Sequence, residues 1–117
     1  MKVTPLREHA QSDVQMDDAE NVRMRMLVGP SEGAKTFHMR HFEIQPGGHT
    51  PHHRHDYEHE LLILRGQGTA RSEGGDRPFR CGDVIWVPPN ETHQFRNTGN
   101  EPLEFICLIP AACDCST

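Results

Sequence analysis

The sequence predicts a single antiparallel all-β domain, and three observations support this prediction. The chain has 117 residues, which is the size of one domain with one hydrophobic core. From residue 22 onward, short runs rich in β-branched and aromatic residues alternate with clusters of Gly, Pro and Asn. The chain contains no internal repeat of fixed period, so a repeat architecture is excluded.

The predicted strands lie where apolar and β-branched residues gather. The first, residues 22–28, follows a polar and acidic segment, residues 1–20, which we expect to form an N-terminal arm. Residues 111–117 are expected to form a C-terminal tail, so the folded domain covers residues 21–110. The other predicted strands are residues 36–45, 60–65, 68–72, 84–87, 93–97 and 103–109.

The segments between these strands carry residues that turns require. Residues 46–48 read Pro-Gly-Gly and residues 88–90 read Pro-Pro-Asn. These residue types either fix φ near −65° or tolerate a positive φ. Residues 72–77, Ser-Glu-Gly-Gly-Asp-Arg, are typical of a hairpin tip.

Composition excludes some partners. The net charge is −5, with 17 acidic and 12 scattered basic residues, which argues against a nucleic-acid surface. The longest apolar run, residues 105–109, is far shorter than the roughly 20 residues of a membrane span. The first residues lack the apolar stretch of a signal peptide, so we expect no membrane association and a cytoplasmic location. The four cysteines follow no CxxC spacing, and the roles of Cys113 and Cys115 stay open.

The most informative feature is the number and spacing of the histidines. The chain has nine His but one Trp and one Tyr, and imidazole is the commonest metal ligand. His53 and His55 form a His-x-His pair, which places two imidazoles on one strand face about 6.7 Å apart. His59 has the same parity but joins them only if residues 56–58 turn the chain. His93 opens a later strand after a proline turn and can face the same point from the opposite side of a barrel.

These stretches resemble the two sequence motifs of the cupin superfamily. The motif G-x5-H-x-H-x3,4-E-x6-G is matched by Gly47, His53, His55 and Gly66. The motif G-x5-P-x-G-x2-H-x3-N is matched by Gly82, Pro88, His93 and Asn97, with Asn90 in place of its glycine. The resemblance implies a jelly-roll barrel, also called a double-stranded β-helix, in a single-domain cupin.

One position departs from the family pattern. The slot of the glutamate ligand, seven residues before Gly66, is held by His59, and Glu60 fits only the looser spacing from His55. Adjacent strand residues point to opposite faces, so His59 and Glu60 should not both be ligands. The sequence also resembles small cupins in which four histidines hold the metal. We therefore favour His53, His55, His59 and His93 as the ligands, with Glu60 as the alternative to His59.

The predicted site suggests what the protein binds. Imidazole donors suit one divalent transition metal per chain, namely Zn, Cu, Fe or Ni, and the resemblance adds Mn. Four neutral imidazoles leave the charge of the ion uncompensated, which favours an anionic oxygen ligand. By strand parity, Leu61, Ile63 and Phe95 would line an apolar substrate pocket above the ion.

The sequence is compatible with two functions. One is a mononuclear metal-dependent enzyme, of the dioxygenase type or a related lyase or isomerase, which acts on a small oxygen-rich organic anion. The other is a barrel that binds or senses a small molecule without turnover and holds a structural metal. The fold alone does not decide between them. The resemblance also implies a homodimer.

Overall fold

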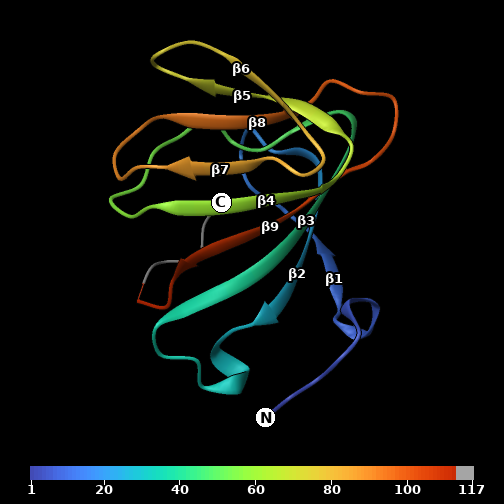
Figure 1. The fold of residues 1–117 in the computed structure, drawn as a ribbon, viewed down its shortest axis with the longest axis vertical. Coiled ribbons are helices and arrows are strands. Elements are labelled where there is room, and N and C mark those ends of the chain that lie inside the picture. Colours follow the sequence, from blue (N-terminus) through green and yellow to red (C-terminus); the bar gives the residue numbers. More distant parts are fainter. Residues whose placement is uncertain (113–117) are drawn as a thin grey trace.

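The computed structural model describes residues 1–112 and confirms the all-β prediction. Within these residues, nine strands join in one curled sheet that forms an open barrel (Figure 1). The helical pieces of the same residues are two 3-10 turns, η1 (Leu6–Glu8) and η2 (Pro30–Glu32), and no helix there could cross a membrane. Cys113 and Cys115, with most of the predicted tail, lie outside the described residues.

Seven of the strands overlap predicted runs, and two were not predicted. The turn predicted at residues 46–48 was wrong, because the strand that begins at Phe37 continues through them to His49, with Gly47 at a φ of +82°. The two additional strands, β1 (Gln11–Asp13) and β6 (Arg77–Arg80), are short and polar. The predicted strands are β2 (Glu20–Val28), β3 (Phe37–His49), β4 (His59–Arg65), β5 (Gln67–Ser72), β7 (Val84–Val87), β8 (His93–Asn97) and β9 (Leu103–Pro110).

The order of the strands leaves the barrel open on one side. Their order is β6-β5-β8-β3-β9-β4-β7, all neighbours are antiparallel, and β2 pairs with β3 and with β1. β6 and β7 are the two ends of this order, so each has an edge without a strand partner in the described chain. The hairpin predicted around residues 72–77 joins β5 to β6, and the N–H of Gly75 donates to the carbonyl of Ser72 at 3.1 Å.

The core fills the interior of the barrel. Inward residues alternate along each strand; β9, for example, buries Leu103, Phe105, Cys107 and Ile109. The rings of Phe42 and Phe105 stack with their centroids 5.3 Å apart. Burial of such side chains removes apolar surface from water, at about 25 cal/mol per Å², and fixes the register of the strands.

Candidate metal centre

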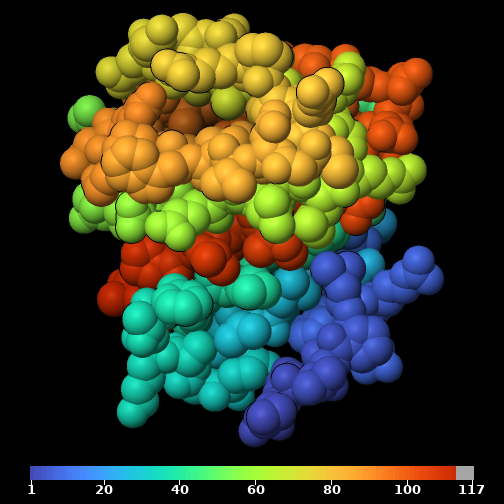
Figure 2. Space-filling model, viewed as in Figure 1, coloured from blue at the N-terminus to red at the C-terminus, as the bar shows by residue number. Residues whose placement is uncertain are grey.

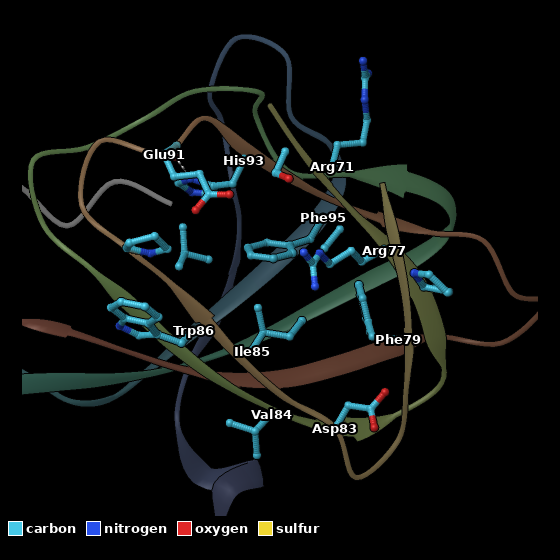
Figure 3. Close-up of a pocket in the computed structure, with 15 residues that line it drawn as sticks. Arg71, Arg77, Phe79, Asp83, Val84, Ile85, Trp86, Glu91, His93 and Phe95 are labelled. Carbon is cyan, nitrogen blue, oxygen red and sulfur yellow. Dashed lines mark hydrogen bonds between the residues drawn. The ribbon is translucent and has the colours of Figure 1, made fainter. Parts of the chain in front are cut away.

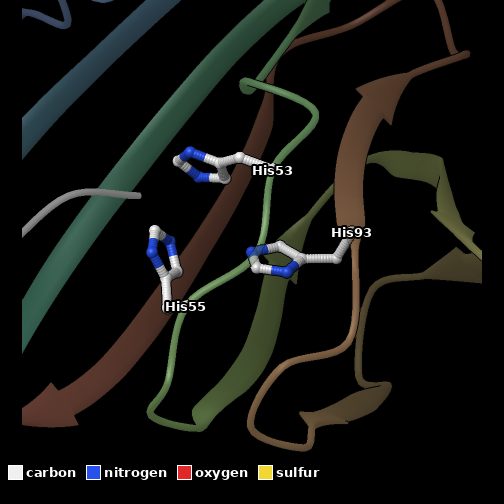
Figure 4. Close-up of side chains that lie close together, drawn as sticks. All are labelled: His53, His55 and His93. Carbon is white, nitrogen blue, oxygen red and sulfur yellow. The ribbon is translucent and has the colours of Figure 1, made fainter.

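Three histidines from two separate stretches of the chain meet in the barrel. His53 and His55 precede β4, and His93 begins β8. One ring nitrogen of each lies within 4.8 Å of those of the other two, and the rings converge (Figure 4). A spacing of this size lets three nitrogens bind one ion at about 2.1 Å each.

The backbone brings these two stretches together. His53 and His93 form an antiparallel bridge, in which the N–H of His53 donates to the carbonyl of His93 at 3.2 Å. The N–H of His93 returns a bond of 2.9 Å to the carbonyl of His53. In addition, the N–H of Asn90 donates to the carbonyl of His55 at 2.6 Å. Main-chain pairing therefore brings the three histidines together.

Three buried ring nitrogens of this region have no hydrogen-bond partner among residues 1–112. They are the Nε2 atoms of His53, His59 and His93. Buried polar atoms are nearly always hydrogen-bonded, so several orphaned nitrogens in one place need an explanation. A divalent metal ion fits this donor set, because it would satisfy the lone pairs that the protein leaves unpaired.

The opposite nitrogens of two rings are held in place. Nδ1 of His93 lies 3.0 Å from the carbonyl oxygen of Glu91, which the N–H form of that nitrogen can donate to. Nδ1 of His59 lies 3.4 Å from the sulfur of Cys107. Such contacts fix the ring orientation and the tautomer, leaving Nε2 as the lone-pair nitrogen.

The environment keeps these imidazoles neutral. Burial, followed by the neighbouring His55, lowers the pKa of His53 to about 4. Burial, followed by the charges of His93 and Arg40, lowers the pKa of His59 to about 2, and burial also lowers the pKa of His93. Only neutral imidazole binds a metal, so these residues need no deprotonation at neutral pH.

The fourth predicted ligand, His59, lies beside these three histidines. It is not one of the residues whose ring nitrogens all lie within 4.8 Å of one another. Its ring centroid is 5.1 Å from that of His55 and 4.9 Å from that of His93, and the residue is 2% exposed. Glu60, the alternative, is exposed and lines a depression together with Phe37. The structure thus groups three of the four predicted histidines, and the four-histidine site stays a prediction.

Two residues beside His59, Arg40 and Cys107, were not among the site residues predicted from the sequence. Arg40 in β3 is fully buried, and its Nη2 lies 3.4 Å from the sulfur of Cys107. Its guanidinium carbon lies 4.9 Å from the ring centroid of Phe42, a cation–π contact. Strand alternation in the sequence could have identified Arg40 as inward-facing, because it lies two and four residues before the buried Phe42 and Ile44.

A cavity of about 470 Å³ adjoins His93. It lies between the β5–β6 hairpin and β7, where Figure 2 shows a recess between the yellow and orange segments. Among the predicted pocket residues, Phe95 lines this cavity, whereas Leu61 and Ile63 are buried in the hydrophobic core. Its lining residues are Ala70, Arg71, Ser72, Arg77, Pro78, Phe79, Asp83, Val84, Ile85, Trp86, Val87, Pro88, Glu91, His93 and Phe95 (Figure 3).

The sequence is related to several named proteins. It is 37% identical over 82 residues to 1-methylthio-D-xylulose 5-phosphate methylsulfurylase of Rhodospirillum rubrum, a match that covers 68% of this chain and 51% of that protein. It is 38% identical over 68 residues to an oxalate-binding protein of Thermotoga maritima, covering 57% of this chain and 56% of that protein. The chain thus spans about half the length of these relatives.

Solved structures and a family profile agree with the fold. The polyketide cyclase RemF of Streptomyces resistomycificus superimposes with a TM-score of 0.89 at 27% identity, over 95% of this chain and 80% of that one. A predicted oxalate decarboxylase of Thermotoga maritima gives a TM-score of 0.83 at 29% identity, over 94% and 99%. The profile of the Cupin domain family matches residues 40–109, which contain all the histidines of the site. The chain therefore belongs to the cupin domain family.

Proposed function

We propose that the protein binds one divalent transition metal through His53, His55, His59 and His93. The observation that carries this proposal is the set of three buried Nε2 atoms that have no hydrogen-bond partner in the described part of the chain. His59 is included because its Nε2 is one of these atoms and its ring lies beside those of His55 and His93. Iron, manganese, zinc, nickel and copper all accept imidazole ligands, with geometry rather than affinity deciding among them.

We further propose that the protein acts on a small, oxygen-rich organic anion, as an enzyme of the oxygenase type or as a related lyase or isomerase. A bound divalent ion supplies Lewis-acid chemistry toward an anionic oxygen. The chain's own contribution is to hold neutral imidazoles at the site and to offer an adjoining cavity lined by Phe79, Phe95 and Ile85. The related methylsulfurylase and polyketide cyclase are named as enzymes, which supports a catalytic role.

The alternative is a barrel that binds or senses a small molecule and does not turn it over. It is supported by the relative that is named as an oxalate-binding protein. The two functions differ in what the metal does. Electron paramagnetic resonance can detect whether an added anion replaces a water molecule on a bound paramagnetic metal, and such exchange would support the enzyme. A tetrahedral zinc whose four positions are all held by protein would support the binding protein.

Elemental analysis of protein purified without chelator or nickel resin tests the metal site. About one metal per chain is expected for the native protein and for Glu60→Ala, whose side chain is exposed, and much less for His59→Ala and His93→Ala. Glu60→Ala is the matched control, since it removes a possible ligand from the neighbouring position. Folded native protein with well below a tenth of a metal per chain after incubation with each divalent ion would contradict the proposal.

We also propose that two chains associate as a homodimer. Val84 and Trp86 in β7 and Leu62 and Leu64 in β4 are exposed large apolar residues, and Leu62 and Val84 are register partners. Adjacent exposed apolar residues are typical of protein contact surfaces. Light scattering coupled to size exclusion should give twice the chain mass, and a monomer at micromolar concentration would contradict the proposal.

A further inference from the structure

The cavity beside the histidines contains one positively charged side chain that points into it. The guanidinium of Arg77 lies among Phe79, Phe95 and Ile85, whereas Arg71 extends away from the cavity (Figure 3). Arg71 is also engaged, with Asp76 at 3.9 Å and with Gln94 at 3.4 Å. Within residues 1–112, the side chain of Arg77 makes no hydrogen bond or ion pair, whereas its backbone pairs with Ala70.

Within residues 1–112, neither acidic residue of the cavity forms an ion pair with Arg77. The carboxylate of Asp83 accepts a hydrogen bond of 2.9 Å from the backbone N–H of Arg80, so it is committed to the turn after β6. Glu91 lies near His93, at the other end of the cavity from Arg77 (Figure 3). The Arg77 end is thus the place in this cavity that attracts an anion, and the walls next to it are apolar.

Strand pairing sets the distance between Arg77 and the histidines. Arg77 pairs with Ala70 of β5, and Ala70 pairs with Phe95 of β8, two residues after His93. With about 4.8 Å between strands and about 3.3 Å per residue, the Cα atoms of Arg77 and His93 are roughly 12 Å apart. An arginine side chain covers much of this span, so a small molecule can contact Arg77 and still reach the histidines.

We propose that Arg77 binds the carboxylate or phosphate group of a ligand whose apolar body packs against Phe79, Phe95 and Ile85. Guanidinium groups pair with such oxyanions through two parallel hydrogen bonds, and the apolar walls favour a ring or short hydrocarbon over a sugar. The proposal narrows the substrate class of the proposed function to anions with an apolar body. Binding of the anionic group by Arg77 does not require a metal. Only the contact between the other end of the ligand and the histidine site rests on the proposed function.

The test uses metal-free protein, so that it is independent of the metal site. Benzoate, phenyl phosphate and neutral benzyl alcohol are titrated by calorimetry, with the fluorescence of Trp86 as a second signal, because this single tryptophan lies on the cavity lining. We expect saturable binding of benzoate or phenyl phosphate, and binding of benzyl alcohol at least about tenfold weaker. The tighter of the two anions identifies the headgroup.

Matched variants on the same strand assign the binding to Arg77. Arg77→Gln should weaken anion binding by about 10-fold to 100-fold, and Arg77→Lys should restore part of it. Arg80→Gln is the control, because Arg80 lies on β6 but does not line this cavity, and it should bind as the native protein does. Both positions are exposed, so unchanged thermal midpoints are expected.

Three results would overturn the proposal: no anion binding, equal binding of benzyl alcohol, or equal losses in Arg77→Gln and Arg80→Gln. The metal content of Arg77→Gln separates this failure from failure of the proposed function. A variant that keeps its metal and loses anion binding supports the Arg77 proposal alone. Native protein that binds anion but never binds metal contradicts the proposed function and leaves the Arg77 proposal standing.

Discussion

The sulfur of Cys107 lies 3.4 Å from Nδ1 of His59, inside the barrel and close to the histidine cluster. The same sulfur lies 3.4 Å from Nη2 of Arg40, which is fully buried. Cys107 therefore contacts a guanidinium on one side and an imidazole on the other. When Nδ1 of His59 carries its proton and donates to this sulfur, Nε2 is left free to bind a metal.

Replacement of Cys107 should weaken metal binding through His59. Cys107→Val keeps a similar volume and removes the sulfur acceptor, so we expect the affinity for a divalent metal to fall by about tenfold. Cys107→Ser offers an oxygen acceptor and should retain more of the affinity. Competition with a chromophoric chelator measures both. Cys81→Val, at an exposed cysteine, is the control, and equal affinities of Cys107→Val and the native protein would show that the sulfur does not position His59.

The metal-free protein should lose stability as the solution becomes mildly acidic. Burial lowers the pKa of His53 to about 4 and that of His59 to about 2, whereas imidazole in an unfolded chain titrates near 6.5. Between these values the unfolded chain binds more protons than the folded chain. The contribution of these histidines to the free energy of unfolding is therefore complete above about pH 6.5. It decreases as the pH falls below that value.

Urea unfolding in the presence of a chelator measures this effect. The midpoint should fall between about pH 7.5 and about pH 5, before most carboxylates titrate. His59→Gln cannot titrate at that position, so its midpoint should depend less on pH. A constant midpoint would mean that these histidines titrate alike in the folded and unfolded chains, and a midpoint that rises on acidification would mean that the folded chain binds protons more readily; either result contradicts the prediction.

Strand alternation made most of the fold predictable, and its absence explains the two missed strands. β6 reads Arg77-Pro78-Phe79-Arg80, with one apolar residue and a proline, and among the described strands it pairs with β5 alone. Proline is tolerated in a strand that pairs on one side, but it removes the sequence signal. β1 contains no apolar residue and, within residues 1–112, pairs with β2 alone, so nothing in its composition predicts a strand.

The metal site was predictable in its residue types but not in its assembly. His53 and His55 follow from their spacing, yet their meeting with His93 depends on a backbone bridge between residues 40 positions apart, which no local pattern encodes. The Cys107–His59 contact joins positions that are 48 residues apart. Such contacts depend on sheet register, which only the packed core fixes.

Gly66 should be intolerant of a side chain. Its φ is +85°, and a Cβ added there would lie 2.7 Å from the carbonyl oxygen of Pro102. Backbone strain and this clash together should cost about 1–3 kcal/mol in Gly66→Ala, measured as the free energy of unfolding in urea. Gly74→Ala is the control, since among the described residues a Cβ there meets only Ser72 Oγ at 3.9 Å. Equal stability of the two variants would contradict the prediction.

Asn90 occupies the place of a family glycine, and its backbone explains why. Its φ is +67°, a left-handed conformation that Asn adopts more readily than most residues, and its N–H holds the carbonyl of His55. Asn90→Gly should therefore leave stability within about 0.5 kcal/mol of the native value. Asn90→Val should cost about 1–3 kcal/mol, because a β-branched residue is strained there, and should also weaken metal binding by displacing His55.

Thermal unfolding and chelator competition on the same samples test this pair of variants. Asn100→Val, at an exposed loop position without a positive φ, controls for the loss of an asparagine and should resemble the native protein. If Asn90→Gly is as damaging as Asn90→Val, the amide side chain rather than the backbone conformation is what the site requires. If Asn90→Val loses stability but keeps its metal affinity, the Asn90–His55 hydrogen bond does not control the position of His55.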